Sequence, residues 1–423
     1  MFCDSILRGG LTGSAALGLG FLLFFGGCSG SSARPDRAPT VQVPEETLEL
    51  DPMLIRVREG STETETIDAD EVFARAYAAF QSRRYEEATV HYELIIKYFA
   101  TSRFYLPALY NGGLAYEQLQ LWESAARNYR KVVEVFGGSK EATDAHYRLA
   151  NVYSELGDYN QVVELMTEVM LRDLSHFDRI EAHVRRSNAL LEIGSLVEAE
   201  SGFRTLLRLN EQATENDQVP ENSHFIVQSY FGLGRVYHQR VAAIRLMLPP
   251  ERMGDDLQQK ADLFLRAQSN YIRALRFHHP HWSVAAGYMI GRMYEDFYID
   301  LFTAEIPDDL TDEEVAMYFD ELRSQIKPLM ERAIQVYERN LSLSQRIANS
   351  EQADRWVEQT ATQLTRLRAY LSDPRTQRRA EKLVRAGRDL SELWDAGQLA
   401  RDAVNEALHQ ATQLSAKRQK RTL

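Results

Sequence analysis

Small and bulky residues recur every 37 positions along residues 69–209, within apolar segments that have helical periodicity. One small residue marks the second segment of each unit, at Ala88, Ala125, Val162 and Ala199. Another lies twelve positions earlier, at Ala76, Gly113, Ala150 and Ser187. Bulky side chains stand three positions before the first marker (Tyr85, Trp122, Tyr159, Leu196) and four after it (Tyr92, Tyr129, Met166, Phe203). The pattern predicts four tandem pairs of antiparallel helices that cross closely at the small residues.

The period fails after Leu209, but its markers persist through residues 210–349. Gly234-Arg235-Val236-Tyr237 and Gly291-Arg292-Met293-Tyr294 lie 57 positions apart, and extra chain replaces the short turn inside each unit. These residues therefore predict two elongated helix hairpins.

Proline and threonine suggest where the long helices begin and end. In the fifth unit we expect the first helix to continue to Leu248 and the second to span 251–277. In the sixth unit we expect the first helix to reach about Ala304. Thr311 is then expected to cap a second helix that Pro328 kinks or restarts.

The C-terminal region has two parts. Residues 350–372 are amphipathic and predict a helix that caps the exposed end of the array. Residues 373–423 predict a basic helical tail, because 375–423 hold eleven Lys and Arg against six Asp and Glu. This tail is either a loosely docked helix or an arm that docks on an acidic partner or on anionic headgroups.

The N-terminal region carries a targeting pattern. An apolar run from Leu11 to Phe25 precedes Gly26-Gly27-Cys28-Ser29. It is too short to span a bilayer and resembles a bacterial lipoprotein signal, which implies that residues 1–27 are removed and Cys28 is lipidated. The alternative is an ordinary secretory signal. Ser29 resembles signals that are sorted to the outer membrane.

Residues 28–68 are polar and predict a flexible tether. Leu54 to Arg58 could be a short extended piece, and Asp68 or Asp70 is expected to cap a helix that begins near Glu71.

The residues from Leu149 to Tyr159 (LANVYSELGDY) resemble a tetratricopeptide repeat, with Ala150 at the crossing and Gly157 at the turn. The resemblance implies an all-α, right-handed superhelical solenoid of about six helix hairpins with a C-terminal capping helix. The segments between repeats resemble those of periplasmic envelope proteins, such as outer-membrane assembly lipoproteins and cell-division coordinators.

Composition and motifs argue against a nucleic-acid-binding protein and against an enzyme. The net charge of −12 argues against nucleic acid as a partner, and Cys3 and Cys28 are the only cysteines. Ser324 and Lys327 match a short SxxK motif without its companion motifs, so we expect no enzyme and no cofactor. His278, His279 and His281 are weak metal candidates in what is otherwise a hydrated or capping turn.

The resemblance implies that first-helix residues line a concave, partner-binding face. One row holds mainly aromatic residues: Phe73, Tyr110, Tyr147, Val184, Phe231 and Tyr288. A neighbouring row holds Tyr77, Asn151, Asn188, Arg235 and Arg292. Alternatively, these rings are structural.

We therefore expect a non-catalytic interaction scaffold, anchored by lipid to the periplasmic face of the outer membrane. Its partners would be other outer-membrane or periplasmic proteins of an envelope complex. The long last units resemble tetratricopeptide-repeat lipoproteins of gliding-motility machinery. One alternative is an assembly factor for outer-membrane barrels or for a pilus secretin. A more distant one is a cell-wall-acting enzyme that uses the repeats as a platform.

Overall fold

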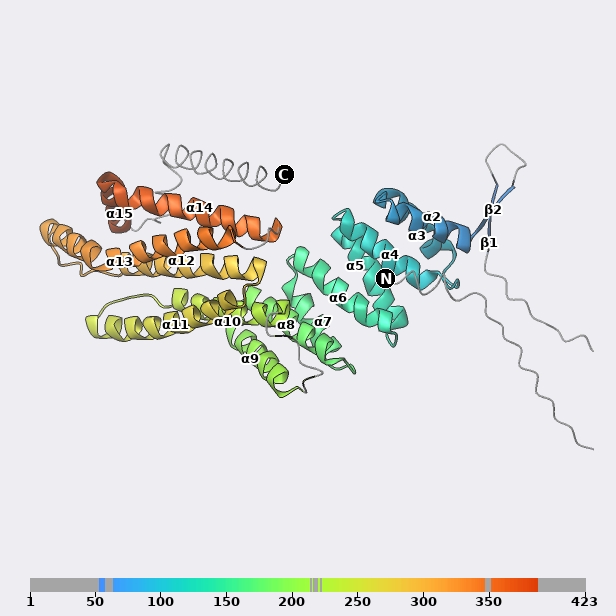
Figure 1. Cartoon of the computed structure of the whole chain (residues 1–423), viewed down its shortest axis with the longest axis horizontal. Coiled ribbons are helices and arrows are strands. Elements are labelled where there is room, and N and C mark those ends of the chain that lie inside the picture. Colours follow the sequence, from blue (N-terminus) through green and yellow to red (C-terminus); the bar gives the residue numbers. More distant parts are fainter. Residues whose placement is uncertain are drawn as a thin grey trace, which may run out of the picture. The chain divides into compact units, whose positions relative to one another are not determined.

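The computed structural model describes residues 53–57, 64–213, 215, 220, 223–346 and 351–386 (Figure 1). The two strands are β1 (Met53–Val57) and β2 (Thr64–Asp68). The described helices are α2 (Ala69–Gln81), α3 (Tyr85–Tyr98), α4 (Tyr105–Gln118), α5 (Trp122–Phe136), α6 (Lys140–Glu155), α7 (Tyr159–Val169), α8 (His176–Glu192), α9 (Leu196–Gln212), α10 (His224–Ala243), α11 (Pro250–Arg276), α12 (Pro280–Phe302), α13 (Asp312–Ser344), α14 (Glu351–Ser372) and α15 (Pro374–Arg385). Most helices pack chiefly against their neighbours in sequence, as expected of tandem hairpins.

Two segments of the predicted tether, residues 53–57 and 64–68, form strands. β1 and β2 pair antiparallel, with Leu54 opposite Ile67 and Val57 opposite Thr64. The extended piece predicted near Leu54 is confirmed, whereas the prediction of a flexible segment up to residue 68 is wrong for these strands. Asp68 ends β2 and caps α2, since its carboxylate accepts a hydrogen bond from the Glu71 amide at 2.6 Å.

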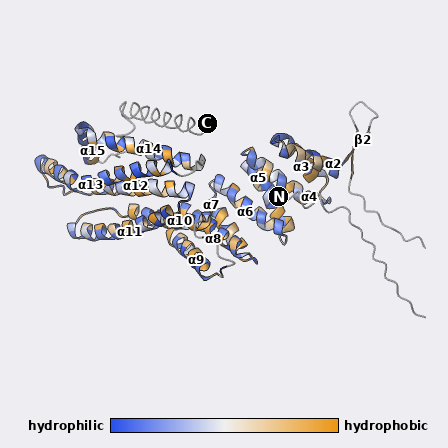
Figure 2. Ribbon diagram, viewed as in Figure 1, coloured by the Kyte–Doolittle hydropathy of each residue, from blue (hydrophilic) through white to orange (hydrophobic). Residues whose placement is uncertain are grey.

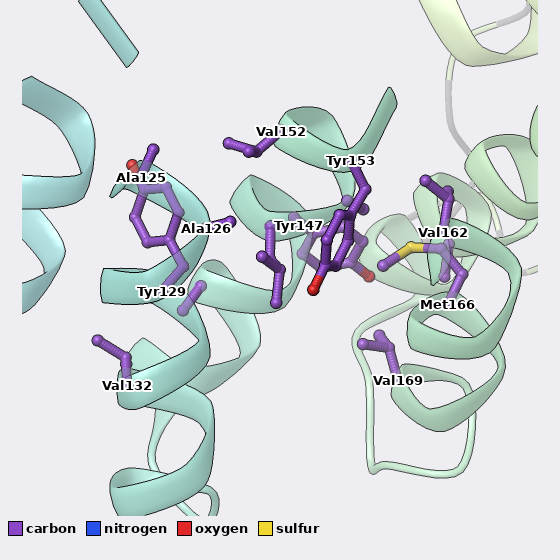
Figure 3. Close-up of a cluster of buried hydrophobic side chains, with 14 of the residues drawn as sticks. Ala125, Ala126, Tyr129, Val132, Tyr147, Val152, Tyr153, Val162, Met166 and Val169 are labelled. Atoms are coloured by element: carbon purple, nitrogen blue, oxygen red, sulfur yellow. The ribbon is translucent and has the colours of Figure 1, made fainter. Parts of the chain in front are cut away.

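The 37-residue markers lie where the prediction put them, inside the hairpins. Ala88, Ala125, Val162 and Ala199 are at most 2% exposed, and the bulky residues four positions later are fully buried. A Cβ added to Gly113 would lie 2.6 Å from the Tyr129 ring, so only glycine fits this crossing. Figure 3 shows Tyr147 and Tyr153 of α6 between the marker residues of α5 and those of α7.

Each regular unit turns between its two helices in the same way. The turn residue has positive φ in all four: Arg83 at 59°, Gln120 at 57°, Gly157 at 74° and Gly194 at 83°. The next amide donates to the carbonyl five residues back, as Asp158 does to Tyr153 at 2.9 Å. This is the Schellman arrangement, which satisfies carbonyls at the helix end.

The two elongated hairpins exist, but their boundaries differ from the prediction. α10 ends at Ala243 rather than near Leu248, so an irregular stretch precedes α11. Thr311 caps α13 through a complete capping box with Glu314, as predicted. Pro328 lies inside α13 and does not restart the helix.

The far ends of the long hairpins are tied together around a buried lysine. Lys260 of α11 is 0% exposed and donates from Nζ to the Val241 carbonyl at 2.6 Å and to the Ile244 carbonyl at 2.8 Å. Its Nζ also lies 2.7 Å from the Asp300 carboxylate of α12. These contacts satisfy the end of α10 and join it to both neighbouring helices.

The capping helix is present as α14, which packs against both α12 and α13. α15 follows it, and the tail beyond residue 386 lies outside the described residues. Figure 2 shows hydrophilic and hydrophobic residues interspersed along the helices. In the part of the chain that the structure describes, no helix combines the length and the apolar composition needed to cross a bilayer.

Candidate functional site

The predicted aromatic row lies mostly inside the array. Phe73, Tyr147 and Phe231 are 8%, 8% and 5% exposed. The Phe73 ring stacks on Phe104 at 4.8 Å between centroids, and the Tyr147 hydroxyl donates to the Asp178 carbonyl at 2.6 Å. In this structure these three rings pack between successive units, and their predicted role as partner contacts stays a prediction.

The C-terminal end of this row is occupied by the chain itself. Trp356 of α14 lies 5.3 Å from Tyr288 and 6.4 Å from Phe231, measured between ring centroids. The predicted cap thus also covers first-helix residues of the fifth and sixth units. In the aromatic row, Tyr110 and Tyr288 remain half-buried and keep some exposed surface.

Most of the polar row makes contacts within the chain. The side-chain oxygen of Asn151 accepts a hydrogen bond from Arg185 of the next unit. Arg235 forms an ion pair with Glu192 at 2.7 Å, which joins α10 to α8. These residues link successive first helices, while Tyr77 and Asn188 are half-buried.

Arg292 belongs to a partly buried charged network. It pairs with Asp296 at 2.8 Å and with Glu295 at 3.3 Å. Burial lowers the pKa of Arg292, but the two carboxylates outweigh burial and the pKa is raised. Asp296 also lies 3.0 Å from His238 of α10, so this network connects the fifth and sixth units.

The histidines form an aromatic contact between the starts of α10 and α12. The Trp282 indole donates to His224 Nδ1 at 3.1 Å, and the His224 and His279 rings are 5.7 Å apart. His224 keeps an exposed surface, but desolvation on its packed side, with help from His279 and His281, lowers its pKa to about 4. Among the described residues, no three metal-capable side chains are grouped to hold an ion, so His278, His279 and His281 do not come together as ligands.

Two further candidates from the sequence are the SxxK residues on α13 and the lipidation site at Cys28. Ser324 and Lys327 are exposed on α13, and Lys327 pairs with Glu331 at 3.3 Å. Cys28 and the preceding signal lie outside the described residues, so lipidation remains a prediction.

Sequence reasoning missed a cavity of about 420 Å³ between α9, α10 and α11. Residues of α10 form its floor, and residues of α9 and α11 form its two walls. On each wall they recur at intervals of three and four, which places them on one helix face. The lining consists of Arg204, Leu207, Arg208, Glu211, Tyr230, Leu233, Tyr237, Arg266, Ser269, Asn270 and Arg273.

The cavity is strongly basic in a chain of net charge −12. Four arginines line it against one carboxylate, that of Glu211. Arg204 is held by Glu200 at 2.9 Å and by the Tyr237 hydroxyl at 2.7 Å. Arg208, Arg266 and Arg273 are exposed and form no ion pair within the described part of the chain. Three guanidinium groups are therefore available to an anionic ligand.

The cavity and the predicted rows use different faces of α10. Tyr230, Leu233 and Tyr237 point into the cavity, whereas Phe231 and Arg235 belong to the predicted rows. At 100° per residue these two sets lie on well-separated sides of the helix. The cavity is a second surface, formed by second helices as well as by a first helix.

Comparison with known proteins supports the repeat assignment. Residues 143–176, which contain most of α6 and all of α7, match the tetratricopeptide repeat family. No curated protein matches the chain.

Several solved structures of repeat proteins are similar to parts of the chain. A tetratricopeptide repeat protein from Parabacteroides merdae is 14% identical, with a TM-score of 0.35, over 69% of this chain and 98% of that one. The C-terminal part of a repeat-containing protein from Cytophaga hutchinsonii is 12% identical, with a TM-score of 0.40, over 78% and 98%. A repeat domain of yeast Sti1 in complex with an HSP90 peptide is 14% identical, with a TM-score of 0.22, over 69% and 98%.

The family match falls on the helix pair that carries Ala150, Val162 and Met166 at the marker positions. The same buried positions recur in the pairs before and after it. The chain therefore contains a tetratricopeptide repeat at residues 143–176 and has the all-α fold of a tetratricopeptide-repeat solenoid.

Proposed function

We propose that the chain is a non-catalytic scaffold that binds other proteins through its helix hairpins. The observation that carries this proposal is the tandem array itself. Each pair buries its own markers and contacts mainly its neighbours, so one continuous core supports a long series of exposed helix faces. Such an array can hold several partners in fixed order.

We further propose that lipid on Cys28 holds this scaffold on the periplasmic face of the outer membrane. The apolar run before Gly26-Gly27-Cys28 supports this part of the proposal, and the polar residues from Ser29 to about Asp51 would act as the tether. The scaffold would then organise a multiprotein envelope complex, of the gliding-motility kind or a similar one.

Replacing the two cysteines separately tests the anchor. Cys28→Ala should move the protein from the membrane fraction to the soluble fraction and abolish labelling by radioactive palmitate. Cys3→Ala, in the segment that would be removed, should leave both unchanged. Retention of the Cys28→Ala protein in membranes would refute lipidation at this residue.

Site-specific photo-crosslinking in intact cells tests the scaffold. Crosslinkers would replace exposed apolar residues: Leu265 (61% exposed) and Met317 (72%) on the long hairpins, and Val90 (62%) on a regular unit. We expect each position to capture a small and reproducible set of envelope proteins. Capture of lipid alone, or of no protein at any of the three positions, would overturn the proposal.

A further inference from the structure

The basic cavity between α9, α10 and α11 has the dimensions of a short polypeptide segment. With a rise of about 1.5 Å per helical residue, Arg266 and Arg273 are about 10 Å apart along the α11 wall, and Arg208 lies on the α9 wall. An extended peptide advances about 3.3 Å per residue, so acidic side chains about three residues apart match this spacing. A single phosphate would occupy only part of the 420 Å³.

The floor and walls combine two kinds of contact. Leu207, Leu233 and the Tyr230 ring provide apolar surface, and the Arg273 guanidinium lies 5.6 Å above the centre of the Tyr230 ring. Arg208 donates to Thr205 at 3.2 Å, and within the described residues its guanidinium has further N–H groups that can donate. A fitting ligand therefore presents carboxylates to the rim and an apolar side chain to the floor.

We propose that this cavity binds an acidic segment of a partner polypeptide, in which apolar residues lie between aspartate or glutamate residues about three positions apart. Arg208, Arg266 and Arg273 receive the carboxylates as bidentate partners, while Arg204 stays on Glu200 and Tyr237. The inference rests on the proposed scaffold function and names the chemistry of one partner.

Binding at this site depends on local charge acting against the charge of the whole chain. The protein carries a net charge of −12, which repels acidic ligands at a distance, whereas the three rim guanidiniums attract them at contact. Added salt screens both effects but weakens contact pairs at an exposed rim. The affinity for an acidic peptide should therefore fall as salt rises.

The test uses the purified full-length chain and a fluorescein-labelled peptide with aspartate at every third position and leucine between, and it measures binding by fluorescence anisotropy. The double variant Arg208→Gln, Arg266→Gln should weaken binding at least tenfold. The matched control is Arg245→Gln, Arg339→Gln, which removes two exposed arginines outside the cavity and should change binding less than twofold. Circular dichroism should show the same helicity for all three proteins, because none of these arginines forms an ion pair in the described chain.

Three outcomes would overturn the inference. Equal weakening in both double variants would mean general charge attraction. Equal binding of a peptide with asparagine in place of aspartate would mean that carboxylates are not recognised. Failure of the peptide, together with cavity-dependent binding of inorganic phosphate or of anionic phospholipid vesicles, would assign the cavity to a phosphoryl group. In each case the crosslinking result at Leu265 and Met317 would stand, so failure here is separate from failure of the scaffold function.

Discussion

Four equivalent turns of the array place one residue in the left-handed conformation, and glycine fills only two of them. Gly157 and Gly194 serve the third and fourth units, whereas Arg83 and Gln120 serve the first and second. The hydrogen bonds around the turns match, since the amides of Leu121 and Asp158 each donate five residues back at 2.9 Å. The same substitution can therefore be compared at equivalent backbone sites.

The expected free energies follow from the backbone. An L side chain in the left-handed region costs about 1–2 kcal/mol. Replacing glycine with alanine recovers about 0.4–1 kcal/mol by restricting the unfolded chain. Gly157→Ala should therefore destabilise its hairpin by about 1 kcal/mol, and Gln120→Gly should stabilise the second unit by up to about 1 kcal/mol. Neither glycine at a turn has an atom within 4 Å of its missing Cβ, so no steric contact complicates the comparison.

Amide hydrogen exchange is the suitable assay, because stacked repeats open locally and one melting temperature mixes their contributions. Gly157→Ala should speed exchange near the α6–α7 turn about fivefold, and Gln120→Gly should slow it at the α4–α5 turn. Gly138→Ala is the control, since its added Cβ also meets no atom within 4 Å and its φ is not positive. If Gly157→Ala speeds amide exchange near its turn no more than Gly138→Ala does near residue 138, the reasoning from turn geometry is refuted.

Two more predictions concern the long hairpins. Gly234→Ala would place its Cβ 2.5 Å from the Tyr271 ring and should lower the free energy of unfolding by about 1–3 kcal/mol, measured in urea. The control Gly254→Ala, in open space on α11, should raise it by up to about 1 kcal/mol. Equal effects of the two changes would contradict the close crossing at Gly234. The pKa of His224 is about 4 in the folded chain against about 6.5 in the unfolded chain. Between these values only the unfolded chain binds the proton, so stability should fall as the pH is lowered from 6.5 to 4. The urea midpoint followed against pH should show this loss, and His224→Gln should reduce it; an unchanged slope would rule out His224 as its source.

The fold was predictable because one local rule repeats. Ala88 and its equivalents are small because two helices cross closely there, and the bulky residue four positions later fills the space beside the crossing. The rule survives where the period fails. Gly291 would meet the Tyr337 ring at 2.2 Å if it carried a Cβ, although these residues are 46 positions apart rather than the sixteen that separate Gly113 from Tyr129. The extra chain lengthens the helices beyond the crossing and leaves the crossing intact.

The helix ends and the binding rows were less predictable, because they depend on distant partners. α10 ends at Ala243, where Lys260 of the next helix donates to the carbonyls of Val241 and Ile244. Arg235 reads as a free cation in sequence, but Glu192 of α8 pairs with it. Trp356 suggests a buried face of a capping helix, yet nothing local shows that it reaches Phe231 and Tyr288.

The cavity required a relation that no periodic pattern contains. Arg204 and Arg266 are 62 residues apart and belong to the second helices of two successive units. The 37-residue register does not align them. They line one cavity because α10 lies between α9 and α11 and presents Tyr230, Leu233 and Tyr237 as a shared floor. In the regular unit 74 residues before Arg204, Arg130 of α5 donates to Tyr153 at 2.7 Å, as Arg204 donates to Tyr237. That contact is common to both units. What distinguishes the cavity is the second wall of arginines on α11, so the helix that breaks the period also supplies the charge on which the proposed acidic partner depends.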